Sequence, residues 1–386
     1  MISKYNINAK AMSYSYMQKR VIMFDEQKIL ARFLELVKTD SPSGSEGAVR
    51  EKLIAEFCKL GCSYDVDKKG NLKIELPGTI DAPVRLFSAH MDTVEPGWGV
   101  KPRVNGRGVI TSDGTTILGA DDKDGITAIW CALDKVISNN IPHPPIEILF
   151  SVCEEANLGG AKQFEGTWIK SRVGWVFDGS GKLGAYYRNG VGKTGYRFEI
   201  TGRAAHSGIC PEKGLNALIA ASDAMLSFQP GHVDGATVNY GTVKGGTADN
   251  IVPEKVVVTG EIRAQETSLR RRIETELENS WRRTIGKHSC TLDIIHSDGY
   301  PAFSLPPCSP HQKMTETVLR SCGLDPELLE FKAGCDANYL SVFGIDVCII
   351  ATGRTGNHTT GESTTVSNLN ALTDIAYALM IFLIKK

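Results

Sequence analysis

From Asp25 onward the chain alternates two kinds of segment, and this alternation limits the folds that it can adopt. Stretches with apolar residues at helical spacing are followed by short apolar runs that end in polar residues. The first helical stretch carries apolar residues on one face, at Ile29, Phe33, Leu36 and Val37. Alternating helices and strands are typical of α/β layer folds, in which helices cover a sheet. We therefore expect an α/β domain whose sheet is flanked by helices.

The order of segments changes between about Gly190 and Pro301. Here the pattern predicts strand, helix, strand, strand, helix and strand, which is the order of a ferredoxin-like α+β unit. After Pro301 the α/β pattern returns and ends in a helix around 369–383. The expected organisation is an N-terminal extension over 1–24, a main domain in two parts over 25–189 and 302–386, and an inserted domain over 190–301.

Composition argues against several classes of function. Lys and Arg number 43 against 44 Asp and Glu, so the net charge of −1 offers no basic excess for nucleic-acid phosphates. No apolar run approaches the roughly 18 residues of a membrane helix, and 1–23 lacks the apolar core of a secretory signal. Ten irregularly spaced cysteines indicate neither a disulfide framework nor a structural zinc knuckle. We expect a cytoplasmic protein that binds neither nucleic acid nor membrane.

His90 and Asp92 stand where an apolar strand-like run ends. Side chains two apart on a strand point the same way, so the Asp92 carboxylate can support the His90 imidazole, as carboxylates do for metal-ligating histidines. Taken alone, a histidine and an aspartate at a strand end are more often ordinary loop residues.

The acidic sequence GADDKDG, at 119–125, precedes a helix expected from about Ile126. One interpretation is an acidic N-terminal cap, which the helix dipole favours. The other is that one of these carboxylates bridges two cations. Taken alone, the segment favours the helix cap.

Glu154 and Glu155 follow an apolar strand expected over 146–152. Two adjacent glutamates repel each other unless a cation or a shared proton relieves them. If the chain is extended here, the two side chains face opposite ways, and one can bind a metal while the other serves as a base. A helix is expected to follow from about Gly159.

Candidate residues from different parts of the chain share one position in the expected fold, just beyond the carboxyl ends of strands. They are His90, Asp121, Glu154, Glu155, Asp178 and His358. That edge of an open α/β sheet is where ligands bind. Imidazoles and carboxylates suit Zn²⁺ and also Mn²⁺ or Co²⁺, and a bridged pair of such ions is a known route to amide hydrolysis.

Five motifs, in this order, resemble a known family: HMD, GADDKDG, CEEANLGGAK, FDG and GNHTTGE. The resemblance is to the dinuclear zinc peptidases that include peptidase T, carboxypeptidase G and the aminoacylases, and it is greatest for the peptidase T branch. It extends over nearly the whole chain after about residue 25, including GRAAHSGICPEKGLNAL and GGTADNIVPEKVVVTGEIR in the inserted segment. It implies a zinc-peptidase catalytic domain with a mixed sheet flanked by helices, interrupted by a ferredoxin-like lid or dimerisation domain.

By position, the resemblance assigns metal ligands. It implies that His90, Asp121 and Asp178 hold one metal ion. It also implies that Asp121, Glu155 and His358 hold the other, with Asp121 as the bridge.

The resemblance also assigns residues that act on the substrate. Glu154 would be the general base and Asp92 the partner of the ligating histidine. In the inserted domain, His206, Asn250 and Arg263 would contact substrate. For Asn250 and Arg263, a purely structural role at a strand edge stays open at this point.

The activity implied by the resemblance is metal-dependent hydrolysis of short peptides, with release of the N-terminal residue and with tripeptides as the preferred substrates. A water bridging two Zn²⁺ would attack the scissile carbonyl, with Glu154 as general base. The expected partners are a short peptide and a second copy of the chain, joined as a homodimer through the inserted domain. The alternatives are a deacylase or carboxypeptidase with the same metal site, or a non-catalytic metal-stabilised binding protein, against which the presence of Glu154 argues.

Overall fold

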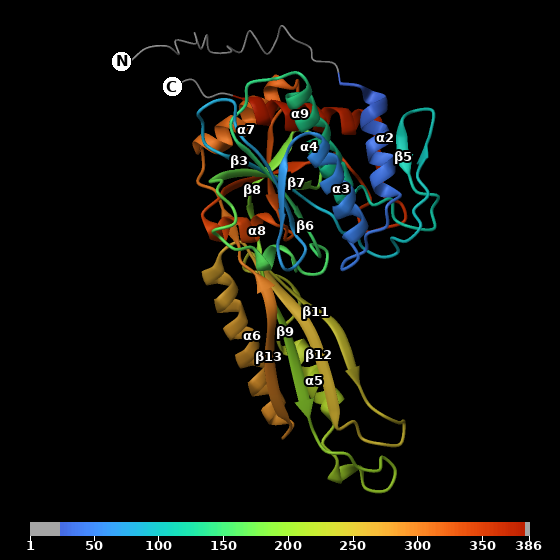
Figure 1. The fold of residues 1–386 in the computed structure, drawn as a ribbon. Helices are drawn as coiled ribbons and strands as arrows, with labels where there is room; N and C mark the ends of the chain where they lie inside the picture. The colour runs from blue at the N-terminus through green and yellow to red at the C-terminus, as the bar shows by residue number, and fades with distance from the viewer. Residues whose placement is uncertain (1–23, 383–386) are drawn as a thin grey trace. The chain divides into compact units, whose positions relative to one another are not determined.

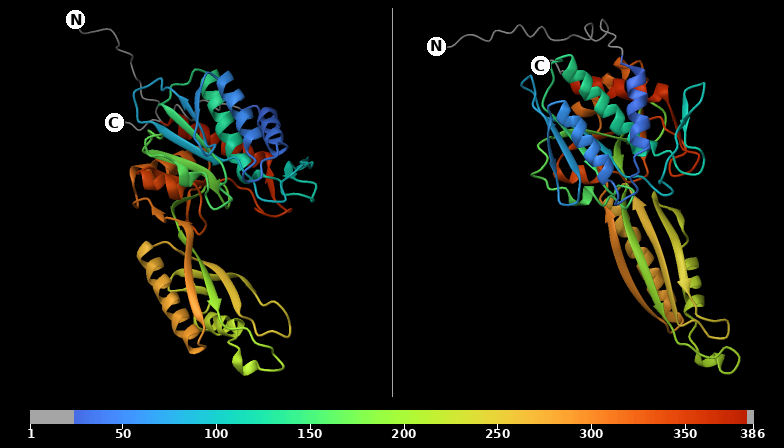
Figure 2. Two further views of the ribbon diagram at one scale, coloured as in Figure 1. Left: turned by 60° about the horizontal axis from the view of Figure 1, so that its bottom comes forward. Right: turned by 45° about the vertical axis from the view of Figure 1, so that its right-hand side comes forward.

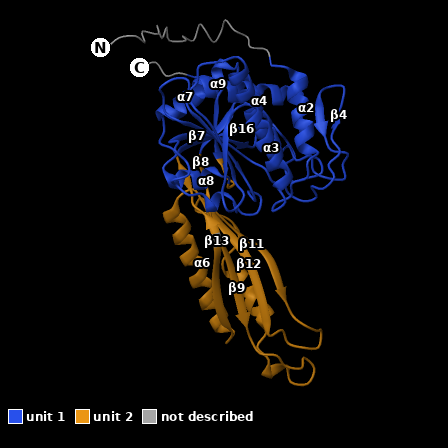
Figure 3. Cartoon of the chain, in the orientation of Figure 1, with its two compact units in different colours: residues 1–188, 305–330, 335–386 blue, residues 189–304, 331–334 orange. Residues whose placement is uncertain are grey.

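The computed structural model describes residues 24–382, and the chain divides into two compact units (Figure 3). Unit 1 contains residues 1–188, 305–330 and 335–386, and unit 2 contains residues 189–304 and 331–334. Apart from Phe24, the N-terminal extension expected over 1–24 lies outside the described residues. Unit 2 is therefore built mainly from one continuous segment in the middle of the chain.

A mixed sheet forms the centre of unit 1 (Figure 1). Its strand order is β1-β2-β6-β3-β7-β16-β8-β14, with β15 paired to β8. The strands are β1 (Ser63–Val66), β2 (Leu72–Leu76), β3 (Arg85–His90), β6 (Ile146–Ser151), β7 (Val173–Gly179), β8 (Ala185–Gly190), β14 (Phe303–Ser304), β15 (Glu327–Phe331) and β16 (Asp346–Ala351). The last two residues of β8 pair with β14 inside unit 2.

The middle strands β6, β3, β7 and β16 run parallel to one another. Every residue of β3 and β6 is buried, as is typical of parallel strands covered on both faces. The flanking strands β2 and β8 pair antiparallel with this group, which makes the sheet mixed. Because parallel strands end at one edge of the sheet, the residues that follow β6, β3, β7 and β16 are brought together.

Helices pack around this sheet. Those of unit 1 in the described residues are α2 (Glu26–Val37), α3 (Gly47–Lys59), α4 (Ala120–Ser138), α7 (Pro310–Ser321), α8 (Ala337–Leu340) and α9 (Val366–Ile381). The carboxylate of Asp25 caps α2 by accepting hydrogen bonds from the backbone N–H groups of Gln27 and Lys28. The buried face of α2 consists of the residues expected from the sequence: Ile29, Phe33, Leu36 and Val37.

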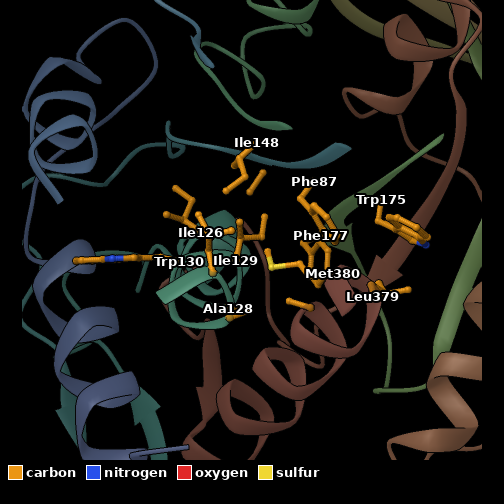
Figure 4. Packing of buried hydrophobic residues seen from close by; sticks show 14 of the residues in the cluster. Phe87, Ile126, Ala128, Ile129, Trp130, Ile148, Trp175, Phe177, Leu379 and Met380 are labelled. Carbon is orange, nitrogen blue, oxygen red and sulfur yellow. The ribbon is translucent and has the colours of Figure 1, made fainter. Parts of the chain in front are cut away.

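The main core of unit 1 fixes the position of α4, which packs against β3, β7, α2 and α9. Figure 4 shows Ile126 and Ile129 of α4 among apolar side chains of the strands and of α9. On the sheet, the ring of Phe87 stacks on Trp175 with 5.4 Å between the ring centroids. Burying apolar side chains is worth about 25 cal/mol per Å² of surface removed from water, so this packing holds the start of α4 firmly beside the strands.

A second, small sheet in unit 1 has the order β17-β5-β4. Its strands are β4 (Arg103–Val104), β5 (Val109–Thr111) and β17 (Ser363–Thr365). The helix expected from about Gly159 is wrong, because only one 3₁₀ turn, η1 (Ala161–Gln163), forms there. The backbone before it bends sharply, with positive φ at Asn157 and Leu158. A Cβ atom at Gly160 would lie 2.1 Å from the carbonyl oxygen of Val152, so this glycine allows a close approach of two backbones.

Unit 2 is a ferredoxin-like sheet with two helices (Figure 2). Its strand order is β10-β11-β12-β9-β13, and neighbouring strands are antiparallel. The elements are β9 (Gly192–Thr201), α5 (Ala217–Ser227), β10 (Gly231–Val233), β11 (Ala236–Gly245), β12 (Lys255–Ala264), α6 (Thr267–Lys287) and β13 (Thr291–Tyr300), with the 3₁₀ turn η2 (Pro211–Lys213). The short strand β10 is additional to the four strands expected from the sequence.

The core of unit 2 lies between its sheet and its helices, which pack against each other and against β9 and β12. Trp281 of α6 is fully buried and stacks on Phe198 of β9 with 4.0 Å between ring centroids. The Trp281 indole N–H donates to the hydroxyl of Tyr240, 3.0 Å away, which satisfies its one polar group. Unit 2 thus has a hydrophobic core of its own.

The predicted fold class is confirmed: a mixed sheet flanked by helices, with an inserted ferredoxin-like unit. All ten cysteines lie in the described residues and are free thiols. Among the described helices, none combines the length and the apolar character that crossing a membrane requires.

Candidate metal centre

Unit 1 gathers the six candidate side chains at the carboxyl edge of its parallel strands. His90 is the last residue of β3, Asp178 lies near the end of β7, and Asp121 stands at the start of α4. Glu154 and Glu155 follow β6, and His358 follows β16. Residues up to 268 positions apart in sequence, from His90 to His358, therefore meet, because β3 and β16 both lie beside β7 in the sheet.

Three overlapping groups of these residues could each hold a metal ion, because their ligand atoms lie within 4.8 Å of one another. The first, called site A below, is His90, Asp121 and Asp178. The second, called site B, is Asp121, Glu155 and His358. The third is His90, Glu154 and Glu155. Sites A and B share Asp121 and are the two sets that the motif resemblance implies.

His90 is buried and faces carboxylates on both sides of its ring. Its Nε2 lies 3.1 Å from Oδ1 of Asp121 and 3.9 Å from Oδ1 of Asp178. Its Nδ1 lies 3.0 Å from the backbone oxygen of Asp92 and 3.5 Å from Oδ1 of that residue. The nearer partner of Nδ1 is therefore the Asp92 backbone rather than its carboxylate. Both contacts orient Nε2 toward Asp121.

The Asp92 carboxylate has a second task, which is to fix the turn after β6. Its Oδ1 accepts from the backbone N–H of Glu154 at 2.8 Å, and its Oδ2 accepts from that of Glu155 at 3.1 Å. The Ser43 hydroxyl also donates to Oδ2, at 2.6 Å. The expectation that the two glutamates lie on extended chain is wrong, because β6 ends at Ser151 and they stand in a turn.

Asp121 divides its two oxygens between sites A and B. Its Oδ1 faces His90, and its Oδ2 accepts from the Asn357 amide at 2.9 Å and lies 3.4 Å from Nε2 of His358. The Glu362 carboxylate holds this segment by accepting from the backbone N–H groups of Gly119 and Asp121, at 2.6 and 2.8 Å. This is the arrangement that a bridging carboxylate requires.

The acidic segment 119–125 does not cap a helix that begins near Ile126. α4 is assigned from Ala120, and its preceding residue, Gly119, makes no side-chain capping bond. Asp121 and Asp122 have non-helical backbone angles inside the assigned helix. The peptide bond between them is cis. The Asp121 side chain faces His90 and His358 rather than the N-terminus of the helix.

His358 completes site B from an exposed loop. Its Nε2 lies 2.9 Å from Oε1 of Glu155, and 53% of its side chain is exposed. Hydrogen bonds to Asp121 and Glu155 raise the pKa of His358 to about 10 in the metal-free protein, despite partial burial. A cation in site B would take the place of that proton between the two carboxylates.

Glu154 is buried beside the same cluster. Burial raises its pKa well above the ordinary value, and the neighbouring Asp178 and Glu155 carboxylates add to this effect against the opposing influence of His90. A carboxylate with raised proton affinity is suited to accepting a proton near neutral pH. This property distinguishes Glu154 from Asp121, whose pKa is held well below its usual range by Arg354, His358 and His90 despite burial.

Sequence reasoning missed Arg354, which lies in the loop after β16 and is buried with its side chain 1% exposed. Its guanidinium donates to four carboxylates: Asp121, Asp122, Asp124 and Asp178. An arginine in a Gly- and Thr-rich loop gives no sign of burial in the sequence. Its proximity to His358, four residues later, was the one available signal.

The three predicted substrate-contacting residues lie in unit 2. His206 and Asn250 are exposed on adjacent loops, joined by a hydrogen bond from the Ser207 N–H to the Asn250 backbone oxygen at 3.0 Å. Arg263 is half-buried on β12, where its Nε lies 2.7 Å from Oε1 of Glu261. His206 and Asn250 are thus brought together, whereas Arg263 stands on a separate strand.

The donor set fits divalent transition metals. Two imidazoles and several carboxylates converge, and such mixed N and O sets suit Zn²⁺, Mn²⁺ or Co²⁺ rather than Ca²⁺. Burial and the adjacent Asp121 raise the pKa of Asp178 to about 7, a sign of crowded negative charge that a cation would relieve.

Comparisons with known proteins agree with this geometry. A sequence profile of the M20 peptidase dimerisation domain matches residues 191–287. The uncharacterised protein YqjE of Bacillus subtilis is 32% identical over 93% of this chain and 99% of its own length. Among solved structures, the aminopeptidase PepT of Bacillus cereus is 31% identical, with a TM-score of 0.86, and a tripeptidase of Staphylococcus aureus is 30% identical, with a TM-score of 0.89. Each covers 93% of this chain and 98% of the solved chain.

Proposed function

The chain belongs to the M20 family of metallopeptidases, in its peptidase T branch, and we propose that it releases the N-terminal residue of short peptides, with tripeptides as preferred substrates. The observation that carries this proposal is the pair of three-residue groups, sites A and B, that share Asp121 beside the buried Glu154. Two relatives of similar length are named as an aminopeptidase and a tripeptidase, which supports the substrate class.

The proposed metal ligands follow from these groups. His90, Asp121 and Asp178 would hold one cation in site A, and Asp121, Glu155 and His358 would hold the other in site B. Zn²⁺ is the proposed metal, with Mn²⁺ or Co²⁺ as substitutes. When bound, the two ions supply Lewis-acid polarisation of the scissile carbonyl and a lowered pKa for the attacking water.

In this proposal Glu154 moves the protons. Its carboxylate accepts a proton from the attacking water and then delivers it to the amine that leaves, which is the role of a general base followed by a general acid. The Asp92 carboxylate holds the backbone of Glu154 and Glu155 in place, so the base and the adjacent ligand keep their relative positions. His206 is proposed to donate to the oxygen that becomes negative during the attack.

The inserted domain expected over 190–301, which lies within unit 2, is proposed to act as lid and dimerisation domain. The match of its segment 191–287 to a peptidase dimerisation domain supports a homodimer. A lid must move to admit and enclose a peptide. The ten free thiols are in keeping with a reducing cytoplasm, which is the proposed location.

His206→Ala is expected to lower kcat by about a hundredfold, the lower end of the range for loss of one oxyanion donor. Metal content should stay unchanged, because His206 is in neither metal site. His232→Ala, an exposed histidine of the same unit, serves as the control and should retain wild-type kinetics.

Light scattering should show a dimer, and a fully active monomer at micromolar concentration would contradict the proposed assembly.

Arg263 is proposed to bind the C-terminal carboxylate of the peptide. Glu261 engages its Nε, while its Nη1 makes only a long contact, 3.4 Å, with the backbone oxygen of Lys332. A guanidinium can hold a carboxylate through two parallel hydrogen bonds. Amidating the C-terminus of a tripeptide should therefore lower kcat/KM by about ten- to a hundredfold, the equivalent of a charged hydrogen bond.

Arg263→Met should remove that preference, so that free and amidated tripeptides are cleaved at similar rates. Rates that still differ as in the wild type would assign recognition of the carboxylate to another residue.

A panel of substrates tests the proposed function as a whole. The zinc-loaded protein is incubated with di-, tri- and tetrapeptides, each with free ends, an acetylated N-terminus or an amidated C-terminus. Cleavage of free tripeptides after the first residue is the expected result, and N-acetylation should abolish it. Efficient cleavage of N-acylated amino acids, with free tripeptides untouched, would identify a deacylase with the same metal site.

A further inference from the structure

Arg354 lies inside the candidate metal centre, and the proposed chemistry gives it no role. Its guanidinium is the nearest cation to four carboxylates that would otherwise face one another. Such a buried cluster is costly unless its charges are compensated. Arg354 therefore compensates part of the negative charge of the site.

The two ends of the guanidinium contact different partners. Nη1 donates to Oδ1 of Asp122 at 2.9 Å and to Oδ1 of Asp124 at 3.0 Å. Neither aspartate belongs to any of the candidate metal groups. These two contacts therefore anchor Arg354 independently of any bound metal ion.

Nη2 points to site A. It lies 2.6 Å from Oδ1 of Asp121 and 2.5 Å from Oδ1 of Asp178, the oxygen atoms that also face Nε2 of His90. The oxygen of Asp121 that serves site B is Oδ2, which faces His358 instead. Arg354 thus contacts two of the three residues of site A, and it contacts site B only through the shared Asp121.

We propose that Arg354 is a fixed third cation of this centre, which weakens metal binding at site A relative to site B, so that site B fills first. This inference rests on the proposed two-metal function. A guanidinium that shares ligand oxygens with a dication repels it and withdraws negative charge from the same carboxylates. The anchoring by Asp122 and Asp124 keeps Arg354 in place when metal arrives, so the repulsion persists.

The same contacts make Arg354 a stabilising residue of the metal-free protein. Without it, four buried carboxylates have no guanidinium partner, and the apoprotein should unfold at a lower temperature. Metal binding should then raise the unfolding temperature more in a variant that lacks Arg354 than in the wild type, because ligand binding stabilises the state that it binds. Removal of Arg354 is therefore expected to lower the stability of the metal-free protein and to raise its metal affinity at site A.

Single-site variants allow the two sites to be measured separately. His358→Ala removes a ligand of site B and leaves site A, whereas His90→Ala leaves site B. Zn²⁺ affinity is measured in each by competition with a chromophoric chelator. His90→Ala should bind Zn²⁺ at least about tenfold more tightly than His358→Ala, because only site A shares its oxygens with the guanidinium.

Arg354→Met is then introduced into each background. Affinity should rise at least about tenfold in His358→Ala and change less than about threefold in His90→Ala, because the lost charge is adjacent to site A. Arg354→Lys keeps a positive charge and should leave the affinity of site A close to its starting value. Arg32→Met is the matched control, since Arg32 pairs with Asp134 on α4, away from the candidate ligands. It should lower stability without changing either affinity.

The outcomes separate this inference from the function on which it rests. If neither single-site variant nor the wild type binds Zn²⁺, the proposed two-metal function is wrong. If Zn²⁺ binds but the two single-site variants have equal affinities, or Arg354→Met weakens site A, the inference is wrong and the function stands. If Arg354→Met does not fold, Arg354→Gln replaces it, and the comparison of His90→Ala with His358→Ala still decides the order of filling.

Discussion

Glu154→Gln is expected to lower kcat for a tripeptide by about a hundredfold to ten thousandfold, the range for loss of general acid–base catalysis. The amide keeps the size of the side chain but cannot accept the proton of the attacking water. Metal content should stay at the wild-type level, because Glu154 is in neither site A nor site B. Steady-state kinetics and elemental analysis of one preparation measure both quantities.

Glu155→Gln is the matched control, because it makes the same change one residue later. Oε1 of Glu155 lies 2.9 Å from Nε2 of His358, and Glu155 is a proposed ligand of site B. This variant should therefore bind less metal at site B. The comparison matters because both glutamates also form a group with His90. Loss of metal in Glu154→Gln, with metal retained in Glu155→Gln, would show that the two roles are reversed.

Asp121→Ala is expected to lower metal occupancy at both sites and to abolish measurable turnover. The reason is geometric: Oδ1 of Asp121 faces His90, Oδ2 faces His358, and no other residue belongs to both site A and site B. Elemental analysis after zinc loading should find two ions per chain in the wild type and well under two in the variant. Circular dichroism establishes that the variant is folded.

His90→Ala and His358→Ala provide the comparison for this experiment. Each should lose mainly one ion per chain, because each histidine serves one of the two sites. An Asp121→Ala protein that kept both ions, or a wild type that was fully active with one, would rule out the bridged pair.

Most of the fold follows from periodicity in the sequence. The face of α2, the buried strands β3 and β6, and the strand and helix order of unit 2 are all visible as spacings of apolar residues. The expected helix after Gly159 failed because backbone packing decided that segment. Gly160 lies against the Val152 carbonyl, and no pattern of apolar residues reports so close a contact between backbones.

The candidate site was partly predictable for a related reason. Residues that follow parallel strands meet at one edge, so six of them could be grouped without knowing any distance. The path of the chain between strands could not be inferred. The turn at Glu154, which Asp92 holds through backbone N–H groups, and the inward direction of Arg354 depend on contacts between segments far apart in sequence.

The place of β16 in the sheet has a consequence for synthesis on the ribosome. β16 lies between β7 and β8, although unit 2 is translated after β8 and before β16. Domains generally fold as units as they emerge, so unit 2 can form while the sheet of unit 1 still lacks a central strand. Asp121, Asp122, Asp124 and Asp178 are then all present before Arg354 and His358 exist. The nascent chain must therefore carry these acidic residues without Arg354 and His358 until residues 346–358 emerge, and the sheet of unit 1 is exposed to misfolding until β16 inserts.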